Sequence, residues 1–240
     1  MCCCFCQNHD IAMGSRGRAV SVERLGEIFL ELKEKGAANI NLVTGAHYVP
    51  QIIEALDMAR RKGLDIPVVY NSSGYEKTET LKLLEGYVDI YLPDLKYLDP
   101  ELAQKFSYAP DYVQAAKAAI REMVRQTGKC EFGEDGYIRK GTIVRHLILP
   151  GHTGNSIKAL RYLHETYGED IYISIMNQYT PVRKFVEFKE LNRKVTKREY
   201  EKVLDAAVDM GIQNGFIQEG ETASESFIPD FDYEGVEKNT

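Results

Sequence analysis

The chain has 240 residues, of which 44% are hydrophobic and 28% are charged, and its formal net charge is −6. This composition is typical of a soluble globular protein, and the negative charge argues against nucleic acid as a partner. No apolar run approaches the roughly 18 residues of a membrane span, and the N-terminus lacks the basic segment and apolar run of a secretory signal. We therefore expect a cytoplasmic protein with no nucleic-acid or membrane partner.

Helix-like and strand-like segments alternate along the chain. Residues 21–36 carry apolar side chains at helical spacing, with Ser21 as N-cap and Gly36 at the end. The same criteria predict helices over 49–63, 77–86, 110–128, 156–168 and 196–211. Apolar runs predict strands over 38–45, 66–74, 88–97, 141–151 and 170–179, with a short sixth one over 215–220. This alternation is typical of right-handed βαβ units and a parallel sheet.

The number of strands limits the architecture. Five or six strands are fewer than the eight of a full α/β barrel, so an open doubly wound sheet and a partial barrel both remain. No Gly-x-Gly-x-x-Gly motif follows a strand, which argues against a dinucleotide-binding fold. The chain has no long linker, so we predict one domain over 1–240. It would have a cysteine-rich N-terminal loop over 1–20, a turn-rich insert over 129–141 and an acidic tail over 219–240.

Polar residues gather where the predicted strands end. Asp94 and Lys96 have the i, i+2 spacing that places two side chains on one face of a strand. Because ligands bind at the carboxyl edge of parallel α/β sheets, we interpret the strand ends as a functional cleft. Each residue could also have a structural role as a helix cap, a turn former or an ion-pair partner. The strand-end residues are Thr44, Gly45, Asn71, Ser72, Asp94, Lys96, Arg145 and Tyr179.

Four of the five cysteines lie within the first six residues. Cys3 and Cys6 form a Cys-x-x-Cys pair, whose spacing suits a zinc site, an iron–sulfur cluster or a redox pair. A redox pair normally opens a helix after a strand, and no strand precedes this pair. Zinc would require two further ligands, and the chain has no second Cys-x-x-Cys and no His pair. Metal binding in a reducing compartment is the favoured interpretation.

The segment CCFCQN resembles the second half of the Cys-x-x-x-Cys-x-aromatic-Cys signature of radical S-adenosylmethionine (radical SAM) enzymes. The blocks NLVTGAHYVPQI, NSSGYE, YLPDLKY, VRHLILPG and MNQYTP extend the resemblance to nearly the whole chain. They are most similar to the branch of pyruvate formate-lyase activating enzyme-like proteins. The resemblance implies a partial (β/α)6 TIM-type barrel that uses a [4Fe–4S] cluster and S-adenosyl-L-methionine. It also implies an oxidoreductase that reductively cleaves S-adenosylmethionine to a 5′-deoxyadenosyl radical for hydrogen abstraction.

The same resemblance implies partners and cofactor contacts. The partners would be a glycyl-radical enzyme or a small-molecule substrate, together with an electron donor such as flavodoxin or ferredoxin. Cys3 and Cys6 match two cluster cysteines, and Phe5 matches the aromatic residue near the adenine. Thr44 and Gly45 stand where most members have a Gly-Gly-Glu segment for the methionyl amine. The acid is missing here, so backbone groups would have to bind the amine.

Other positions match residues around the amino-acid end of the cofactor. Lys96 matches the lysine that pairs with the methionyl carboxylate, and such a residue at a strand end is suited to clamping a zwitterion. Positions that hold the amino-acid end or a cation beside it match Asn71, Ser72 and Asp94. Positions that face cofactor and substrate match Arg145 and Tyr179, so the implied catalytic residues are Lys96, Arg145 and Tyr179.

The first cysteine of the signature would stand four residues before Cys3, which is two residues upstream of Met1. The first barrel strand would also precede this position. We therefore hypothesise that Met1 is an internal methionine, that the chain lacks its first strand, and that it is inactive without the missing cysteine. An in-frame cysteine codon two codons before Met1 is the expected result of reading the upstream gene sequence.

The alternative is a non-catalytic truncated barrel, or an α/β protein that binds zinc through a thiolate cluster. The cluster would consist of Cys2, Cys3, Cys4 and Cys6. Anaerobic reconstitution separates the two classes. About four irons per chain favour the radical enzyme, whereas one zinc favours the alternative.

Overall fold

The computed structural model describes residues 1–12, 17–217 and 235–236. These described residues include three short 3₁₀ turns, η1 (Gly45–Tyr48), η2 (Gly168–Asp170) and η3 (Lys189–Asn192). The described helices are α1 (His9–Ala12), α2 (Val22–Glu34), α3 (Val49–Arg61), α4 (Thr78–Leu83), α5 (Pro100–Ser107), α6 (Tyr112–Thr127), α7 (Thr153–Tyr167) and α8 (Lys197–Asp209). The described strands are β1 (Ile40–Val43), β2 (Val68–Ser72), β3 (Ile90–Pro93), β4 (Glu131–Phe132), β5 (Ile138–Leu147), β6 (Tyr172–Met176) and β7 (Gly215–Ile217).

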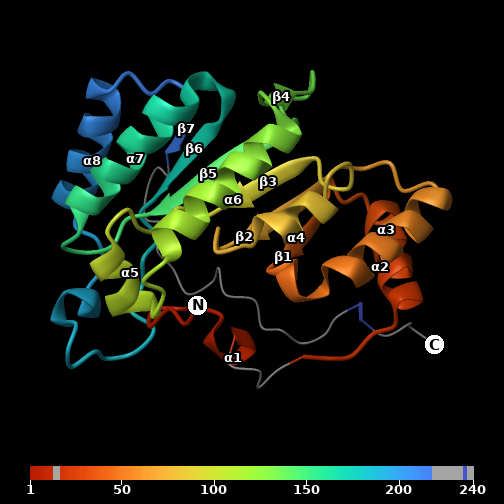
Figure 1. The fold of residues 1–240 in the computed structure, drawn as a ribbon, viewed down its shortest axis with the longest axis horizontal. Coiled ribbons are helices and arrows are strands. Elements are labelled where there is room, and N and C mark those ends of the chain that lie inside the picture. Colours follow the sequence, from red (N-terminus) through yellow and green to blue (C-terminus); the bar gives the residue numbers. More distant parts are fainter. Residues whose placement is uncertain (13–16, 218–234, 237–240) are drawn as a thin grey trace.

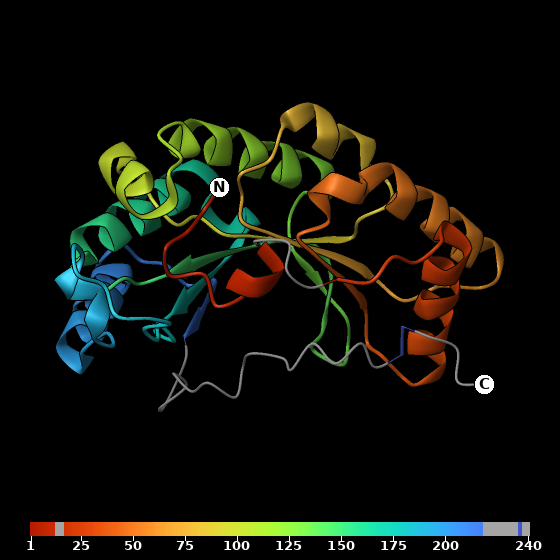
Figure 2. The ribbon, with the colours of Figure 1, turned by 90° about the horizontal axis from the view of Figure 1, so that it is seen from below.

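One curved sheet runs through the molecule in the order β1-β2-β3-β5-β6-β7, and these neighbours are all parallel. Helices α2 to α8 lie along the outer side of the curve and α1 lies on its inner side, so the molecule has the shape of an arch (Figure 1, Figure 2). The strand order never reverses, whereas a doubly wound sheet reverses at its switch point. The fold is therefore an open partial α/β barrel, as the resemblance implied.

Local sequence signals explain several element boundaries. The Ser21 side chain accepts a hydrogen bond from the Arg24 backbone N–H at 3.1 Å, which caps α2. Thr196 and Glu199 form a capping box at the start of α8. At the end of α6, Gly128 adopts a φ of +66°, a conformation that glycine reaches without strain. The helices and strands predicted from periodicity are thus found, with ends that differ by a few residues.

Two elements are additional to the prediction. α5 begins after Asp99, whose side chain accepts from the Glu101 N–H, and it buries Ala103 and Phe106. With only 8 residues, its apolar pattern is too short to stand out between a strand and a long helix. In the insert, β4 pairs antiparallel with residues 138–140, so β5 begins before the predicted residue 141.

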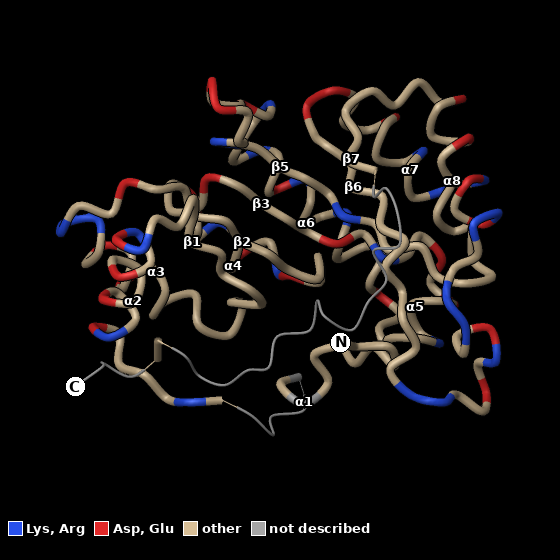
Figure 3. The backbone as a smooth tube through the Cα atoms, turned by 180° about the vertical axis from the view of Figure 1, so that it is seen from behind, with Lys and Arg blue, Asp and Glu red and all other residues tan. Residues whose placement is uncertain are grey.

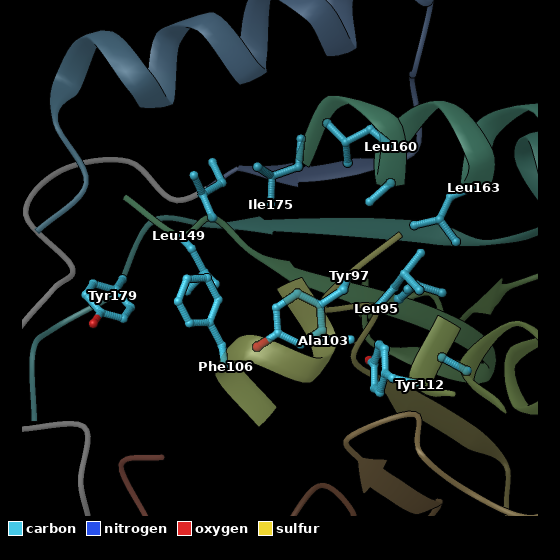
Figure 4. Packing of buried hydrophobic residues seen from close by; sticks show 14 of the residues in the cluster. Leu95, Tyr97, Ala103, Phe106, Tyr112, Leu149, Leu160, Leu163, Ile175 and Tyr179 are labelled. Atoms are coloured by element: carbon cyan, nitrogen blue, oxygen red, sulfur yellow. The ribbon is translucent and has the colours of Figure 1, made fainter. Parts of the chain in front are cut away.

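Two apolar clusters fill the space between the sheet and its helices. One lies below α3 and α4 and includes Leu56 and Leu81, and the other lies below α5, α6 and α7 (Figure 4). Cys4 and Phe5 are both 7% exposed and belong to the second cluster. Residues of both charge signs are spread over the outer helices (Figure 3). Of the cysteine-rich segment, Cys4 and Phe5 are thus part of the packed interior, whereas Cys2 is exposed and Cys3 and Cys6 are partly exposed.

The two ends of the described chain lie on different parts of the arch (Figure 1). None of the described residues before Ile40 is in a strand, so β1 forms one edge of the sheet. Of the acidic tail expected over 219–240, only residues 235 and 236 are described, and their carbonyl oxygens accept from Arg24 on α2. Within the described ranges, no helix is both long enough and apolar enough to cross a bilayer.

Candidate functional site

Four predicted site residues meet at the carboxyl ends of β2, β3 and β5. Lys96 Nζ is 2.5 Å from Asp94 Oδ2, and Arg145 Nε donates to Asp94 Oδ1 at 2.9 Å. Arg145 Nη2 also donates to Asn71 Oδ1 at 2.7 Å. Asp94 lies across a parallel β-bridge from Arg145, and this register brings their side chains together. We call Asn71, Asp94, Lys96 and Arg145 the edge network.

The edge network has two positive groups and one negative group, so its charge is +1 when all three are ionised. The side chains of Asp94 and Lys96 are 14% and 16% exposed, and that of Arg145 is 26% exposed. Burial alone would raise the pKa of Asp94, but Lys96 and Arg145 outweigh it and hold this pKa below its ordinary value. Burial alone would likewise lower the pKa of Lys96, yet Asp94 keeps it above the ordinary value. The site is thus an ionised, partly exposed cluster with one positive charge in excess.

The cysteine-rich segment lies beside the edge network. Its backbone is hydrogen-bonded to the end of α5, since Cys2 N donates to Ser107 O at 2.9 Å and Cys4 N donates to Phe106 O at 2.8 Å. The Ser107 hydroxyl donates to Cys3 Sγ at 3.1 Å. An ionised Cys3 would raise the pKa of Lys96, so the two groups interact electrostatically. Two distant parts of the sequence therefore share one end of the sheet.

The thiols of the segment differ in their surroundings. Burial raises the pKa of Cys6, and the nearby Lys96 works against this rise. Burial raises the pKa of Cys4 to about 11. Phe5 meets Tyr179 edge to face, with ring centroids 6.1 Å apart. The Tyr179 hydroxyl donates to Leu191 O at 2.8 Å, so this predicted catalytic residue is held by the loop that follows β6.

The remaining predicted residues lie around the edge network without joining it. Ser72 is 2% exposed, and its hydroxyl accepts from the Gly74 N–H at 3.1 Å, on the face of β2 opposite to Asn71. Thr44 has a φ of +56°, which is unusual for a β-branched residue, and its N–H donates to Asn71 O at 2.8 Å. Gly45 is buried, and a Cβ there would lie 2.8 Å from Ile52 Cδ1. Strained backbone of this kind is concentrated at binding sites.

Comparison with known proteins identifies the family. The sequence model of the Radical SAM superfamily matches residues 1–163. The chain belongs to the radical SAM superfamily. An uncharacterized protein of Methanocaldococcus jannaschii is 26% identical over 212 residues, which are 85% of this chain and 58% of that protein. The chain thus spans 58% of the length of this relative.

Solved structures of radical SAM enzymes share the fold. A domain of pyruvate-formate lyase-activating enzyme from Bacteroides vulgatus is 13% identical with a TM-score of 0.53, over 75% of this chain and 98% of that one. Methylornithine synthase is 14% identical with a TM-score of 0.59, over 90% and 60%. The FeFe-hydrogenase maturase HydG from Carboxydothermus hydrogenoformans is 13% identical with a TM-score of 0.57, over 91% and 51%. At these identities the similarity shows the architecture alone.

Radical SAM proteins generally bind a [4Fe–4S] cluster and S-adenosylmethionine. The edge network fits a zwitterionic amino-acid group, because it offers cations for a carboxylate and Asp94 for an ammonium group. The cluster fits less well: in the described part of the chain, no three Cys, His, Asp or Glu side chains form a group that could hold a metal. The same finding applies to the zinc alternative. Cys3 and Cys6 remain predicted ligands, and they do not complete a metal site by themselves.

Several residues that contact the edge network or Cys3 were not predicted from the sequence. Tyr112 reaches the backbone on either side of the edge network from the start of α6, and Ser107 reaches Cys3 from the end of α5. Tyr112 and Ser107 lie on the buried faces of α6 and α5. The sequence does not distinguish them from the other core-facing residues of these helices. Gly74 offered a signal within NSSGYE, since a glycine after a strand marks a turn or a close backbone approach.

Glu76 gives this end of the sheet a predicted pH dependence. It is 9% exposed, and burial raises its pKa to about 7 although Ser72 and Tyr70 oppose the shift. Because the folded-state pKa lies above the unfolded value of about 4.3, the stability that protonation provides is present below that value and is lost as the pH rises through about 7. Glu76→Gln should remove this loss, so the variant should gain up to roughly 3 kcal/mol over the wild type between pH 5 and pH 8.

Urea unfolding at several pH values measures the effect of Glu76→Gln. Glu79→Gln, at an exposed position on α4, is the matched control and should follow the wild-type pH profile. Parallel profiles for the wild type and Glu76→Gln would show that the Glu76 carboxyl does not titrate in this range.

Proposed function

We propose that this chain is the barrel domain of a radical SAM oxidoreductase and that the edge network binds the amino-acid end of S-adenosylmethionine. The observation that supports the proposal most strongly is the ionised edge network beside Cys3. Its single excess positive charge and its partial exposure suit a ligand group that carries both a carboxylate and an ammonium.

Each member of the edge network has a role in this proposal. Lys96 pairs with the methionyl carboxylate, and Arg145 stabilises the same charge from β5 while it holds Asn71 in place. Asp94 accepts from the methionyl ammonium group. Asp94 already lies between the two cations. When the ligand binds, its carboxylate and ammonium groups replace contacts that Asp94, Lys96 and Arg145 make with one another in the free protein. The binding site is thus preorganised, which lowers the entropic cost of binding.

The surrounding residues have proposed roles that the sequence resemblance supplies. Backbone groups of Thr44 and Gly45 lie at the neighbouring strand end, where they bind the amine together with Asp94. Phe5 shapes the adenine side of the pocket, against Tyr179. Cys3 and Cys6 are proposed as two thiolate ligands of the cluster that supplies the electron for cofactor cleavage. The described residues bring no third ligand to that group, so we derive no cleavage step from them.

The branch and the partners are also proposals. The resemblance of YLPDLKY and VRHLILPG to activating enzyme-like proteins supports either a glycyl-radical enzyme or a small molecule as the proposed substrate. Flavodoxin or ferredoxin would be the electron donor. Release of 5′-deoxyadenosine in the presence of a reductant, by a version of the chain extended through the missing cysteine, is the activity that tests cofactor cleavage.

Binding by the edge network can be tested without a cluster. Two probes are compared: S-adenosylmethionine carries the amino-acid end and a positive sulfonium, and 5′-methylthioadenosine, a neutral thioether, lacks both. We expect the wild-type chain to prefer S-adenosylmethionine in calorimetric titrations. Lys96→Met should weaken that affinity by about 10- to 100-fold, because a charge-assisted contact of about 1.5–3 kcal/mol is lost, and should leave 5′-methylthioadenosine binding unchanged.

Lys33→Met is the matched control, because Lys33 forms an ion pair with Asp65 at 2.7 Å on the exposed surface of α2. It should bind both probes as the wild type does. Equal wild-type affinity for the two probes, or an unchanged affinity in Lys96→Met, would rule out the proposed role of the edge network.

A further inference from the structure

We propose that Tyr112 is a positioning residue of this site, whose hydroxyl fixes the backbone that carries Asp94 and Lys96. The inference rests on the proposed function, since it assigns the residue that holds the ligand-binding side chains in register. Nothing in the sequence pattern marks Tyr112, which begins α6 and has 0% exposure.

The Tyr112 hydroxyl joins two strand-end loops. It accepts from the Lys96 N–H at 2.9 Å, and its proton points to Asp94 O at 2.8 Å and Ser73 O at 2.9 Å. Ser73 follows β2, whereas Asp94 and Lys96 follow β3. The phenol therefore sets the spacing between the two loops. Its hydrogen-bond partners are the Ser73 and Asp94 carbonyl oxygens and the Lys96 N–H. Buried backbone groups of this kind are costly when they lose their partners.

The loops that follow β2 and β3 are in close backbone contact at Gly74. Gly74 lies against the Asp94 carbonyl oxygen, where a Cβ would collide, and that Cβ would also be 3.5 Å from the Tyr112 hydroxyl oxygen. On the far side of Lys96, Asn155 Nδ2 donates to Lys96 O at 3.1 Å. The Lys96 backbone is thus held from both sides, by α6 through its N–H and by α7 through its carbonyl. Its side chain projects from a fixed point toward Asp94.

Aromatic packing fixes the phenol ring itself. Tyr75 stacks on Tyr112 with centroids 6.0 Å apart and an interplanar angle of 25°. Tyr97 meets Tyr112 edge-on at 5.5 Å and 78°, and both of these rings are labelled in Figure 4. Burial raises the pKa of Tyr112 well above its ordinary value, so the phenol keeps the proton that it donates.

The same aromatic layer reaches the cysteine-rich segment. The Tyr97 hydroxyl is 2.8 Å from Ser107 Oγ, which in turn donates to Cys3 Sγ at 3.1 Å. Tyr112 and Tyr97 therefore connect the edge network with Cys3 through adjoining rings and two hydrogen bonds. A shift of Tyr112 would move Lys96 relative to the thiol beside it.

Tyr112→Phe tests the inference, because it keeps the ring and removes the hydroxyl. We expect about 10-fold weaker binding of S-adenosylmethionine and unchanged binding of 5′-methylthioadenosine, with faster amide hydrogen exchange at Lys96. Tyr91→Phe is the matched control. Tyr91 is also fully buried, and Tyr91→Phe removes one hydrogen bond, to Gln126 Oε1 at 2.6 Å near the other end of α6, whereas Tyr112→Phe removes three. Tyr91→Phe should lower the unfolding midpoint by a smaller amount and leave both affinities and Lys96 exchange unchanged.

The outcomes distinguish a failure of the Tyr112 inference from a failure of the proposed function. If the wild type prefers S-adenosylmethionine and Tyr112→Phe retains that affinity, or loses affinity for both probes alike, Tyr112 is a core residue and the inference is overturned. If the wild type shows no preference between the probes, the proposed function fails, and the ligand-positioning role of Tyr112 fails with it.

Discussion

Asp94→Asn is expected to lower the free energy of unfolding by about 3 kcal/mol at pH 7, because it leaves two partly buried cations without their counter-charge. Lys96 and Arg145 both contact the Asp94 carboxylate, and an amide in its place cannot balance their mutual repulsion. The same change removes the negative charge proposed to bind the methionyl ammonium group. S-adenosylmethionine binding should therefore weaken together with stability, whereas 5′-methylthioadenosine binding should not.

The pH dependence of Asp94→Asn follows from the depressed pKa of Asp94. The folded-state value lies below the unfolded value of about 3.9, so the stability from this carboxylate is present above about pH 4 and is lost as the pH falls through the folded value. Urea unfolding should show a large difference from the wild type at pH 7 that shrinks below pH 4. Asp65→Asn, which breaks an exposed ion pair with Lys33, should change stability little at either pH. A difference that is small at pH 7, or the same at all pH values, would contradict the ion-pair account.

Gly74→Ala is expected to cost about 3–5 kcal/mol, the largest effect of any single methyl group at this site. Two penalties combine at this position. The backbone has a φ of +74°, which L side chains rarely adopt, and the new Cβ would collide with the Asp94 carbonyl oxygen. Because that oxygen belongs to the backbone and accepts from Tyr112, relief requires the β2 and β3 loops to move apart. The variant should consequently also bind S-adenosylmethionine more weakly.

Gly63→Ala separates these two penalties. Gly63 has a φ of +97° with nothing within 4 Å of a built Cβ, so this variant carries the conformational strain alone and should lose only about 1 kcal/mol. Thermal and urea unfolding of the two variants give the comparison. Similar losses in both would show that the contact between Gly74 and Asp94 does not constrain the site.

Much of the fold could be predicted from periodicity because its units are local. Alternating amphipathic helices and buried strands, with caps such as Ser21 and Thr196, indicate parallel βαβ units wherever they occur. The position of the site was predictable for a related reason. The carboxyl ends of parallel strands lie at one edge of the sheet, so Asn71, Asp94 and Arg145 were expected close together although they lie far apart in the sequence.

Other features depend on contacts that no local pattern encodes. Ser72 follows Asn71 directly and was assigned to the same site, yet the strand turns its side chain to the opposite face, toward Gly74 N. α5 was missed because its 8 residues are recognisable only once Ala103 and Phe106 are seen to be buried. Its end holds Cys2 and Cys4 by backbone hydrogen bonds, which the sequence does not indicate.

Periodicity and motif spacing alone indicate the alternating α/β pattern, the edge at which polar residues gather and, through Cys3 and Cys6, the family of the chain. Which of those residues touch depends on how distant elements pack. The register of β3 against β5 placed Asp94 across from Arg145, and the packing of α6 brought the Tyr112 hydroxyl onto the backbone of Lys96. The physical reason is that periodicity encodes which face of an element is buried, whereas register and hydroxyl contacts depend on how distant elements pack together.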